Sequence, residues 1–507
     1  MSKDIQIPDI QNALVLQGGG ALGAYEAGAY KAIYEDRIKE SVKSNVPLFD
    51  IVAGTSSGAI NASVLVSYVL KNGWEGSEKH LEEFWRHLSS TPNLSNWWPN
   101  SFDDDSWVSV WQERHNMNQN AATGETARRY YSAKEYLYSG APKVFSKPNL
   151  EYDNKFFDEF SPPVNLWYKY NNQPLKESIR EFVPVPISTD YLEENKQPRL
   201  LLVSVDIQEG TSVVFDSYPK EKETDERYSK YSSDGIDEDN ENNIEKITRY
   251  NKGIFVDQII ASASVPINYD YTTLMVENHP RDTNVNNKIS NNQTTGYFWD
   301  GGLLSNSPLR ELIQAHRDYW LMKNGISNTQ KKPIENKKID RNYKDLANIQ
   351  IPDLNLYIVD VHPSRNDNIS FDRDGVLNRN IDITYHNRNL YDIKVANIVS
   401  DYVDLFNELI DNIEKNDSND SIINKILSKT TSKSASRSGE DRQYMDLLEG
   451  RFAINELHHF ERRNDENAIS NKAFDFSKQT INQLIEDGYK QTKIRLLEDK
   501  RLREEHH

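Results

Sequence analysis

The segment NALVLQGGGALGAYEAGAYKAI, from Asn12 to Ile33, contains a short apolar run, a glycine-rich loop and the start of a helical pattern. The run from Ala13 to Gln17 is typical of a buried parallel strand, and apolar residues recur at helical spacing from Leu22 to Glu35. A strand, a glycine loop and a helix in this order predict the first unit of an α/β fold.

A second strand and a second helix follow directly. The run from Phe49 to Gly54 is a buried strand by the same criteria, and Ala59 to Leu70 has helical periodicity. The stretch from Arg199 to Ser217 predicts a hairpin around a Glu-Gly turn. Strands and helices alternate between Ala13 and Leu70. This alternation predicts a mostly parallel sheet with helices on its faces.

Other segments predict helices. PLKESIREFV begins a short helix at Pro174, because proline is favoured in the first helical turn. Longer patterns run from Tyr391 to Ile413 and from Ser477 to Leu497.

The 507 residues are expected to divide into two parts. A core is expected to span residues 1–310, with an insertion at about 93–170 and an acidic loop at about 217–252. Residues 311–507 are expected to complete the core with one strand, 354–361, and with long helices.

The overall charge bounds the possible partners. A net charge of -18 argues against nucleic acid and against bulk attraction to anionic lipid, because both are polyanions. Any membrane contact is therefore expected to be apolar and local, for example through Trp97, Trp98 and Trp107. The absence of cysteine excludes disulfides, zinc-thiolate sites and a thiol nucleophile.

Two observations concern the location of the protein. The first residues carry Lys3, Asp4 and Asp9 without an apolar run, which is unlike a secretory signal. No stretch is apolar for the length that a transmembrane helix needs. We therefore expect a cytoplasmic protein; no pattern indicates its oligomeric state.

The glycine loop has the spacing G-x-G-x-x-G at Gly18, Gly20 and Gly23, which occurs in dinucleotide-binding folds. In such a fold the second strand ends in an acidic residue that binds the ribose. Here the strand FDIVAG has its one carboxylate, Asp50, at the beginning. This position argues against a dinucleotide site.

The second strand instead ends in GTSSG, which places G-x-S-x-G at Gly54, Ser56 and Gly58. A serine on a tight strand-to-helix turn has a strained backbone, and the residues two before and two after it must lack bulk. The spacing therefore predicts a nucleophile elbow with Ser56 exposed at the end of the strand.

The same region provides amides for an oxyanion. Ser57 begins a helix, so its amide has no partner within that helix. The amides of Gly19 and Gly20 could approach the same point from the neighbouring strand. Two helix N-termini would then stabilise one negative charge, as acyl transfer requires.

A serine nucleophile needs a base, and two candidates stand out. Among 11 histidines, His362 lies directly after a predicted strand, where a triad histidine could lie. The other candidate is Asp300 in YFWDGGLLSNSPL, which follows aromatic residues and precedes Gly-Gly, with Ser307 and Pro308 as the expected N-cap and first residue of a helix. A carboxylate in apolar surroundings has a raised pKa and is a better proton acceptor.

These residues together resemble the patatin-like phospholipase family. The matching motifs occur in order: the loop GGGALG, the elbow GTSSG, the segment ASASVP from Ala261 to Pro266, and WDGG continuing as LLSNSPL. Stretches around Arg199 and FDFSKQTINQLIEDGY near the C-terminus also look similar to bacterial members. The resemblance covers about half of the chain.

The resemblance implies an α/β fold, a three-layer α/β/α core with a mostly parallel sheet. It implies hydrolysis of lipid acyl esters by a serine and aspartate dyad through an acyl-enzyme, without metal or cofactor. Ser56 would be the nucleophile and Asp300 the base. The oxyanion hole would be formed by amides of Gly18, Gly19, Gly20 and Ser57. Lipids or other esters are the expected substrates, and the protein could bind them at a membrane surface.

One position departs from the family pattern. Many members have arginine or lysine two residues after the third glycine, where this chain has Leu22. The difference concerns head-group preference more than the oxyanion amides.

Three alternatives stay open. An α/β-hydrolase with a Ser-His-Asp triad shares the elbow but places it after several strands, whereas Ser56 follows one. The second alternative is a dinucleotide-binding protein, although this chain lacks the acidic residue that would bind the ribose. A catalytically idle patatin-like scaffold would bind a partner through its polar and aromatic loops.

Overall fold

The structure is a computed structural model. It describes residues 7–44, 46–92, 121–151, 167–191, 197–218, 247–250, 253–277, 293–324, 350–367, 371–386, 420–429, 452–463 and 465–506, with isolated positions between 391 and 444. Trp97, Trp98 and Trp107, most of the acidic loop and much of the helical pattern from Tyr391 lie outside these residues.

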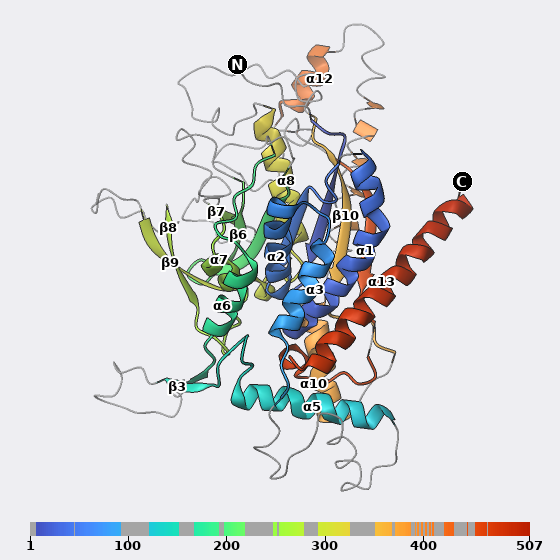
Figure 1. Cartoon of the computed structure of the whole chain (residues 1–507). Coiled ribbons are helices and arrows are strands. Elements are labelled where there is room, and N and C mark those ends of the chain that lie inside the picture. Colours follow the sequence, from blue (N-terminus) through green and yellow to red (C-terminus); the bar gives the residue numbers. More distant parts are fainter. Residues whose placement is uncertain are drawn as a thin grey trace, which may run out of the picture.

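A central sheet organises the described residues (Figure 1). Its strands are ordered β11-β10-β1-β2-β5-β6-β7, and β9 pairs with both β5 and β8. The bounds are β1 Ile10–Leu16, β2 Ile51–Thr55, β5 Arg199–Asp206, β6 Thr211–Asp216, β7 Ile247–Tyr250, β8 Thr272–Glu277, β9 Gln293–Asp300, β10 Asp353–Asp360 and β11 Ile454–Glu461. A separate pair consists of β3 Asn149–Glu151 and β4 Trp167–Lys169.

The strands β11, β10, β1, β2 and β5 run parallel, and β6 and β9 pair antiparallel to β5. The expected hairpin at residues 199–217 is β5 and β6, and the expected strand 354–361 is β10. The C-terminal part also contributes β11, a second strand that the sequence analysis does not predict, because its segment INELHHFE is largely polar.

Helices cover both faces of the sheet, which gives the three-layer α/β/α arrangement. The core side chains of α1, α2, α3 and α13 pack on one face, and those of α8 pack on the other. Figure 1 shows α13 running alongside α1. The bounds are η1 Gly20–Leu22, α1 Gly23–Ser44, α2 Ser57–Asn72, α3 Ser77–Leu88, α5 Ala121–Ser139, α6 Gln173–Phe182, α7 Val256–Ser262, η5 Gly301–Leu303, α8 Leu309–Lys323, α10 Arg373–Tyr385, α12 Asp420–Leu427, η8 Lys472–Phe474 and α13 Lys478–His506.

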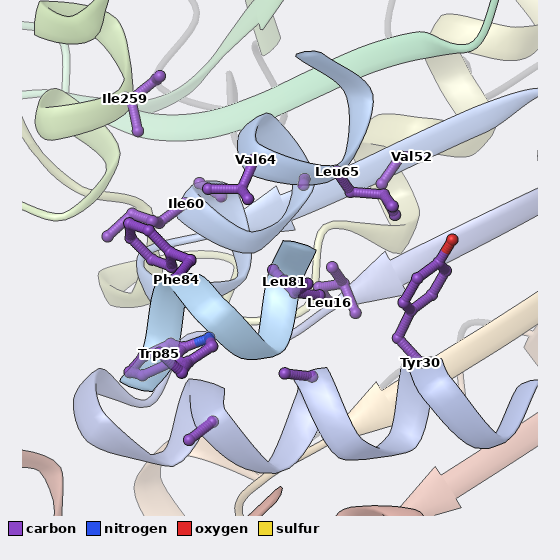
Figure 2. Close-up of a cluster of buried hydrophobic side chains, with 14 of the residues drawn as sticks. Leu16, Tyr30, Val52, Ile60, Val64, Leu65, Leu81, Phe84, Trp85 and Ile259 are labelled. Carbon is purple, nitrogen blue, oxygen red and sulfur yellow. The ribbon is translucent and has the colours of Figure 1, made fainter. Parts of the chain in front are cut away.

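The first strand has this position because both of its faces are apolar. Leu14 and Leu16 pack toward α1 and α2, whereas Ala13 and Val15 pack toward α8. Figure 2 shows the first of these layers, with Leu16 of β1 and Leu81 of α3 among its side chains. A strand that is apolar on both faces is stable only between two layers of helices.

The described part of the insertion at about 93–170 contains the 19-residue helix α5, which no periodic pattern in the sequence predicts. One expectation needs correction. Ser307 does not cap α8: Pro308 is the N-cap and Leu309 is the first residue, while the Ser307 hydroxyl donates to Asp360 Oδ1 at 2.9 Å.

Within the described ranges, no helix combines the length and the apolar composition that crossing a membrane requires.

Candidate active site

Ser56 lies on a strained turn between β2 and α2. Its backbone has φ 54° and ψ -122°, a region that residues other than glycine rarely adopt. A Cβ on Gly54 would lie 2.2 Å from the Gly58 carbonyl oxygen, and one on Gly58 would lie 2.3 Å from the Leu16 carbonyl oxygen. Both glycines are therefore required for this turn, as the elbow motif predicts.

The Ser56 hydroxyl points at a carboxylate. Its Oγ donates to Asp300 Oδ2 at 2.6 Å, a short bond of the kind that forms between a hydroxyl and a charged acceptor. The Ser56 amide donates to Ser262 Oγ at 3.0 Å, and that hydroxyl donates to the Val203 carbonyl of β5. The turn is therefore anchored to the neighbouring strand.

Asp300 ends β9, which pairs antiparallel with β5. Its amide donates to the Ser264 carbonyl at 2.9 Å, and its Oδ1 accepts from the Gly302 amide at 2.7 Å. Burial raises the pKa of the Asp300 carboxyl to about 6, while the hydrogen bonds from Ser56 and Gly302 lower it in part. The carboxylate is thus fixed in place and is more basic than an exposed aspartate.

The glycine loop lies beside this pair. A Cβ on Gly18 would lie 2.9 Å from Ser56 Cβ, and Gly20 has φ +60°. Gly20 and Ser57 are the first residues of η1 and α2, so their amides have no acceptor within their own helices. The Gly19 amide donates to Ser57 Oγ at 2.9 Å.

The amide of Gly18, one of the expected oxyanion donors, already has a hydrogen-bond acceptor. Its amide donates to the Asn306 carbonyl at 3.1 Å, which takes it away from an oxyanion. The Asn306 side chain in turn donates to the Gly18 carbonyl at 3.1 Å. Asn306 is a residue that sequence reasoning missed; its amide side chain directly after WDGGLLS was the available signal.

His362 is buried but does not contact Ser56 within the described residues. Its Nδ1 bonds to Asp382 Oδ1 at 3.1 Å, and burial lowers its pKa. Within the part of the chain that the structure describes, His362 therefore does not form a triad with Ser56 and an aspartate.

The arrangement contains the parts that acyl transfer needs. A hydroxyl contacts a buried carboxylate, and two helix N-termini present amides nearby. Among the described residues, no group of three or more histidine, aspartate or glutamate side chains is arranged to hold a metal ion.

A comparison with family models gives a match: the model described as patatin-like phospholipase covers residues 14–313, more than half of the chain. The chain belongs to the patatin-like phospholipase family. The resemblance seen in the motifs is thus confirmed, and the family supports lipid acyl hydrolysis in general.

Two other comparisons add little. Among solved structures, the crystal structure of VipD from Legionella pneumophila aligns with 12% identity over 96% of this chain and 67% of that chain, with a TM-score of 0.27. A search of curated proteins finds no match.

The patatin-like region includes the glycine loop, the elbow and the WDGG block, but it ends at residue 313. Leu22, which departs from the family pattern, is only 2% exposed and packs in the apolar core. The strands β10 and β11 and the helices α10 and α13 all lie beyond this region.

Proposed function

We propose that this patatin-like protein hydrolyses lipid acyl esters, with Ser56 as nucleophile and Asp300 as base. The observation that carries the proposal is the 2.6 Å bond from Ser56 Oγ, on its strained elbow, to Asp300 Oδ2. A nucleophile in hydrogen-bond contact with its base is the arrangement that covalent catalysis uses.

In the acylation step, Ser56 Oγ attacks the carbonyl carbon of the ester and its proton passes to Asp300. The tetrahedral intermediate then collapses, the bond to the alkoxy oxygen breaks, and Asp300 returns the proton to that oxygen. The alcohol, which for a phospholipid is the lysolipid, leaves. The acyl group stays on Ser56 as an ester.

In the deacylation step, water takes the place of the alcohol. Asp300 accepts a proton from the water as its oxygen attacks the acyl-enzyme, and the proton then returns to Ser56 Oγ. The products are a fatty acid and free enzyme. A pKa of about 6 leaves Asp300 ionised at neutral pH yet basic enough to accept a proton in each step.

The negative oxygen of each intermediate needs hydrogen-bond donors. We assign this role first to the amides of Gly20 and Ser57, which begin η1 and α2. The Gly19 amide contributes after it exchanges the Ser57 hydroxyl for the substrate oxygen. Gly18 is left out because its amide already donates to the Asn306 carbonyl.

The deciding experiment is a panel of phospholipids, neutral glycerides and short p-nitrophenyl esters, scored for free fatty acid or nitrophenol release. Ser56→Ala should abolish release while the melting temperature stays near that of wild type. Ser63→Ala is the matched control, because Ser63 lies in α2, the helix that directly follows Ser56, and its hydroxyl donates to the Ala59 carbonyl one turn earlier. Retained turnover in Ser56→Ala would overturn the assignment.

The choice of base is tested separately. Asp300→Asn should lose nearly as much activity as Ser56→Ala, because the members of a catalytic unit are not additive. An active Asp300→Asn variant together with an inactive, folded His362→Ala variant would favour the triad. A folded wild-type protein that hydrolyses none of the panel would favour the idle scaffold.

A further inference from the structure

The C-terminal end of α10 lies against the glycine loop from the part of the chain beyond the family match. The carbonyl oxygen of Tyr385, the last residue of α10, accepts hydrogen bonds from Gln17 Nε2 at 3.1 Å and from Asn306 Nδ2 at 2.9 Å. An orphan carbonyl at a helix end is thereby satisfied by two residues of the site.

Both of these partners control the position of the glycine loop. Asn306 makes two hydrogen bonds with Gly18. Its side chain donates to the Gly18 carbonyl, and its backbone carbonyl accepts from the Gly18 amide. Gln17 directly precedes Gly18, is fully buried, and accepts from the amides of Val361 and His362 at 2.7 and 2.9 Å. The start of the loop is therefore tied to β10 and to α10.

A buried carboxylate of α10 connects the two segments that lie behind the loop. Asp382 is 1% exposed, and its Oδ1 accepts from His362 Nδ1 at 3.1 Å and from Lys472 Nζ. A Cβ on Gly19 would lie 3.6 Å from His362 Nε2, and one on Gly20 would lie 2.6 Å from the carbonyl oxygen of Ala473, next to Lys472. Asp382 thus binds both His362, which lies next to Gly19, and Lys472, which directly precedes the residue next to Gly20.

The helix α10 is held by these polar contacts and not by an apolar face. Its buried residues are Asn378 and Asp382, whereas Val376, Leu377 and Ile383 are exposed. A buried carboxylate is costly unless it is paired, so its pairing fixes the register of the helix against the loop.

We propose that Asp382 is a positioning residue, through which α10 and the C-terminal part of the chain hold the amides of Gly19 and Gly20 in place for the oxyanion. The inference rests on the proposed acyl-ester hydrolysis and names a further part of that site.

The expected kinetic effect follows from the chemistry. An oxyanion exists in the transition state and not in the bound ester, so a displaced loop lowers kcat and leaves KM nearly unchanged. A displacement of about 1 Å at a reacting centre costs about 100-fold in rate. We expect Asp382→Asn to lower kcat by about 10- to 100-fold, with KM within about twofold of wild type.

The matched control is Asp374→Asn, the same substitution on the same helix. Asp374 accepts from the amide and hydroxyl of Ser470, and among the described residues it makes no hydrogen bond or ion pair with the glycine loop, His362 or Lys472. Both variants weaken the anchoring of α10, but only Asp382→Asn should change kcat. Equal losses of kcat in the two folded variants would show a general effect of stability and would overturn the proposal.

Amide hydrogen exchange gives a readout that does not need activity. Peptides covering residues 17–23 should exchange faster in Asp382→Asn than in wild type and Asp374→Asn. Unchanged exchange and unchanged kcat in folded Asp382→Asn would contradict the proposal. If Asp382→Asn does not fold, Asn306→Ser removes the two side-chain hydrogen bonds by which Asn306 connects the carbonyls of Tyr385 and Gly18, and it should give the same two effects. If wild type hydrolyses no ester, the proposed function fails, while the exchange experiment still decides the role of Asp382.

Discussion

Asp300 combines burial with a fixed hydrogen-bond geometry, and this combination defines its chemistry at the residue scale. Its carboxylate accepts from Ser56 Oγ and from the Gly302 amide while it is 5% exposed. Burial raises its pKa and the two donors limit the rise. An exposed aspartate would be a weaker base. A buried aspartate that accepts no hydrogen bonds would be protonated at neutral pH.

The activity should depend on the ionisation of this carboxyl. Because the base must be ionised to accept a proton, kcat/KM for a short p-nitrophenyl ester should rise with pH through about 6 and then level off. A pH-rate profile between pH 4.5 and 8.5 measures this directly. A profile that is already flat from pH 4.5 upward would show that a raised Asp300 pKa does not govern the reaction.

The same pKa predicts a stability difference. The native carboxyl has a pKa of about 6, above the 3.8 of the free group, so native protein binds more protons between these values and the free energy of unfolding falls as pH rises through this window. The full effect is at most about 3 kcal/mol. Asp300→Asn lacks it, so its stability relative to wild type should increase from pH 4 to pH 7. Denaturant unfolding at both pH values tests this, and a constant difference would contradict it.

Residues at this scale differed in how far the sequence could predict them. Ser56 and Asp300 were predictable because each lies in a short motif with a physical reason for its spacing. Asn306 and Asp382 were not, because their partners Gly18 and His362 are distant in sequence and no local pattern indicates the contact.

At the scale of elements, two tight turns place the reacting groups. The turn at Ser56 is strained, and the loop at Gly20 has a positive φ, so both depend on close backbone packing. The motifs predicted these turns, since glycine is the residue that such conformations favour. The helix α5 and the strand β11 were not predicted, because their sequences mix charged and aromatic residues without a clear apolar period.

Gly20→Ala should destabilise the protein for two reasons, the positive φ of the backbone and a steric clash with Ala473. A control variant separates the two effects. The change forces a Cβ into a backbone with φ +60° and places it 2.6 Å from the Ala473 carbonyl oxygen. Gly210→Ala is the control, because Gly210 has φ +64° and nothing lies within 4 Å of its Cβ position.

Gly210→Ala should cost about 1–2 kcal/mol of unfolding free energy, the cost of the left-handed conformation alone. Gly20→Ala should cost more and should also lower kcat, because the loop must shift. Urea unfolding and ester hydrolysis measure both effects. Equal costs in the two variants would mean that Ala473 does not restrain the loop.

At the scale of the whole molecule, the chain beyond the family match completes the sheet. β10 lies between β1 and β11, and its register with β1 runs from Ile10 opposite Asp353 to Leu16 opposite Val359. The sequence predicts one strand in this part of the chain, whereas the structure has two, β10 and β11.

A fragment that ends at Asn324 should therefore not fold. It would expose the apolar edge of β1, whose residues Leu14 and Leu16 are at most 1% exposed in the full chain. Removal of residues 503–507 is the control, since the neighbouring Leu502 is already 51% exposed. Circular dichroism and hydrogen exchange compare the two truncations. A cooperatively folded, active fragment ending at Asn324 would contradict the assignment of β10 to the core.

The most direct test of the account is covalent labelling of the folded protein by a fluorophosphonate probe, with peptide mass spectrometry to locate the adduct. The probe reacts with an activated serine, so we predict one adduct on wild type, located at Ser56, much slower labelling of Asp300→Asn, and none on Ser56→Ala. An adduct on another serine, or a folded wild-type protein that stays unlabelled, would contradict the claim that Ser56 and Asp300 form an active nucleophile and its base.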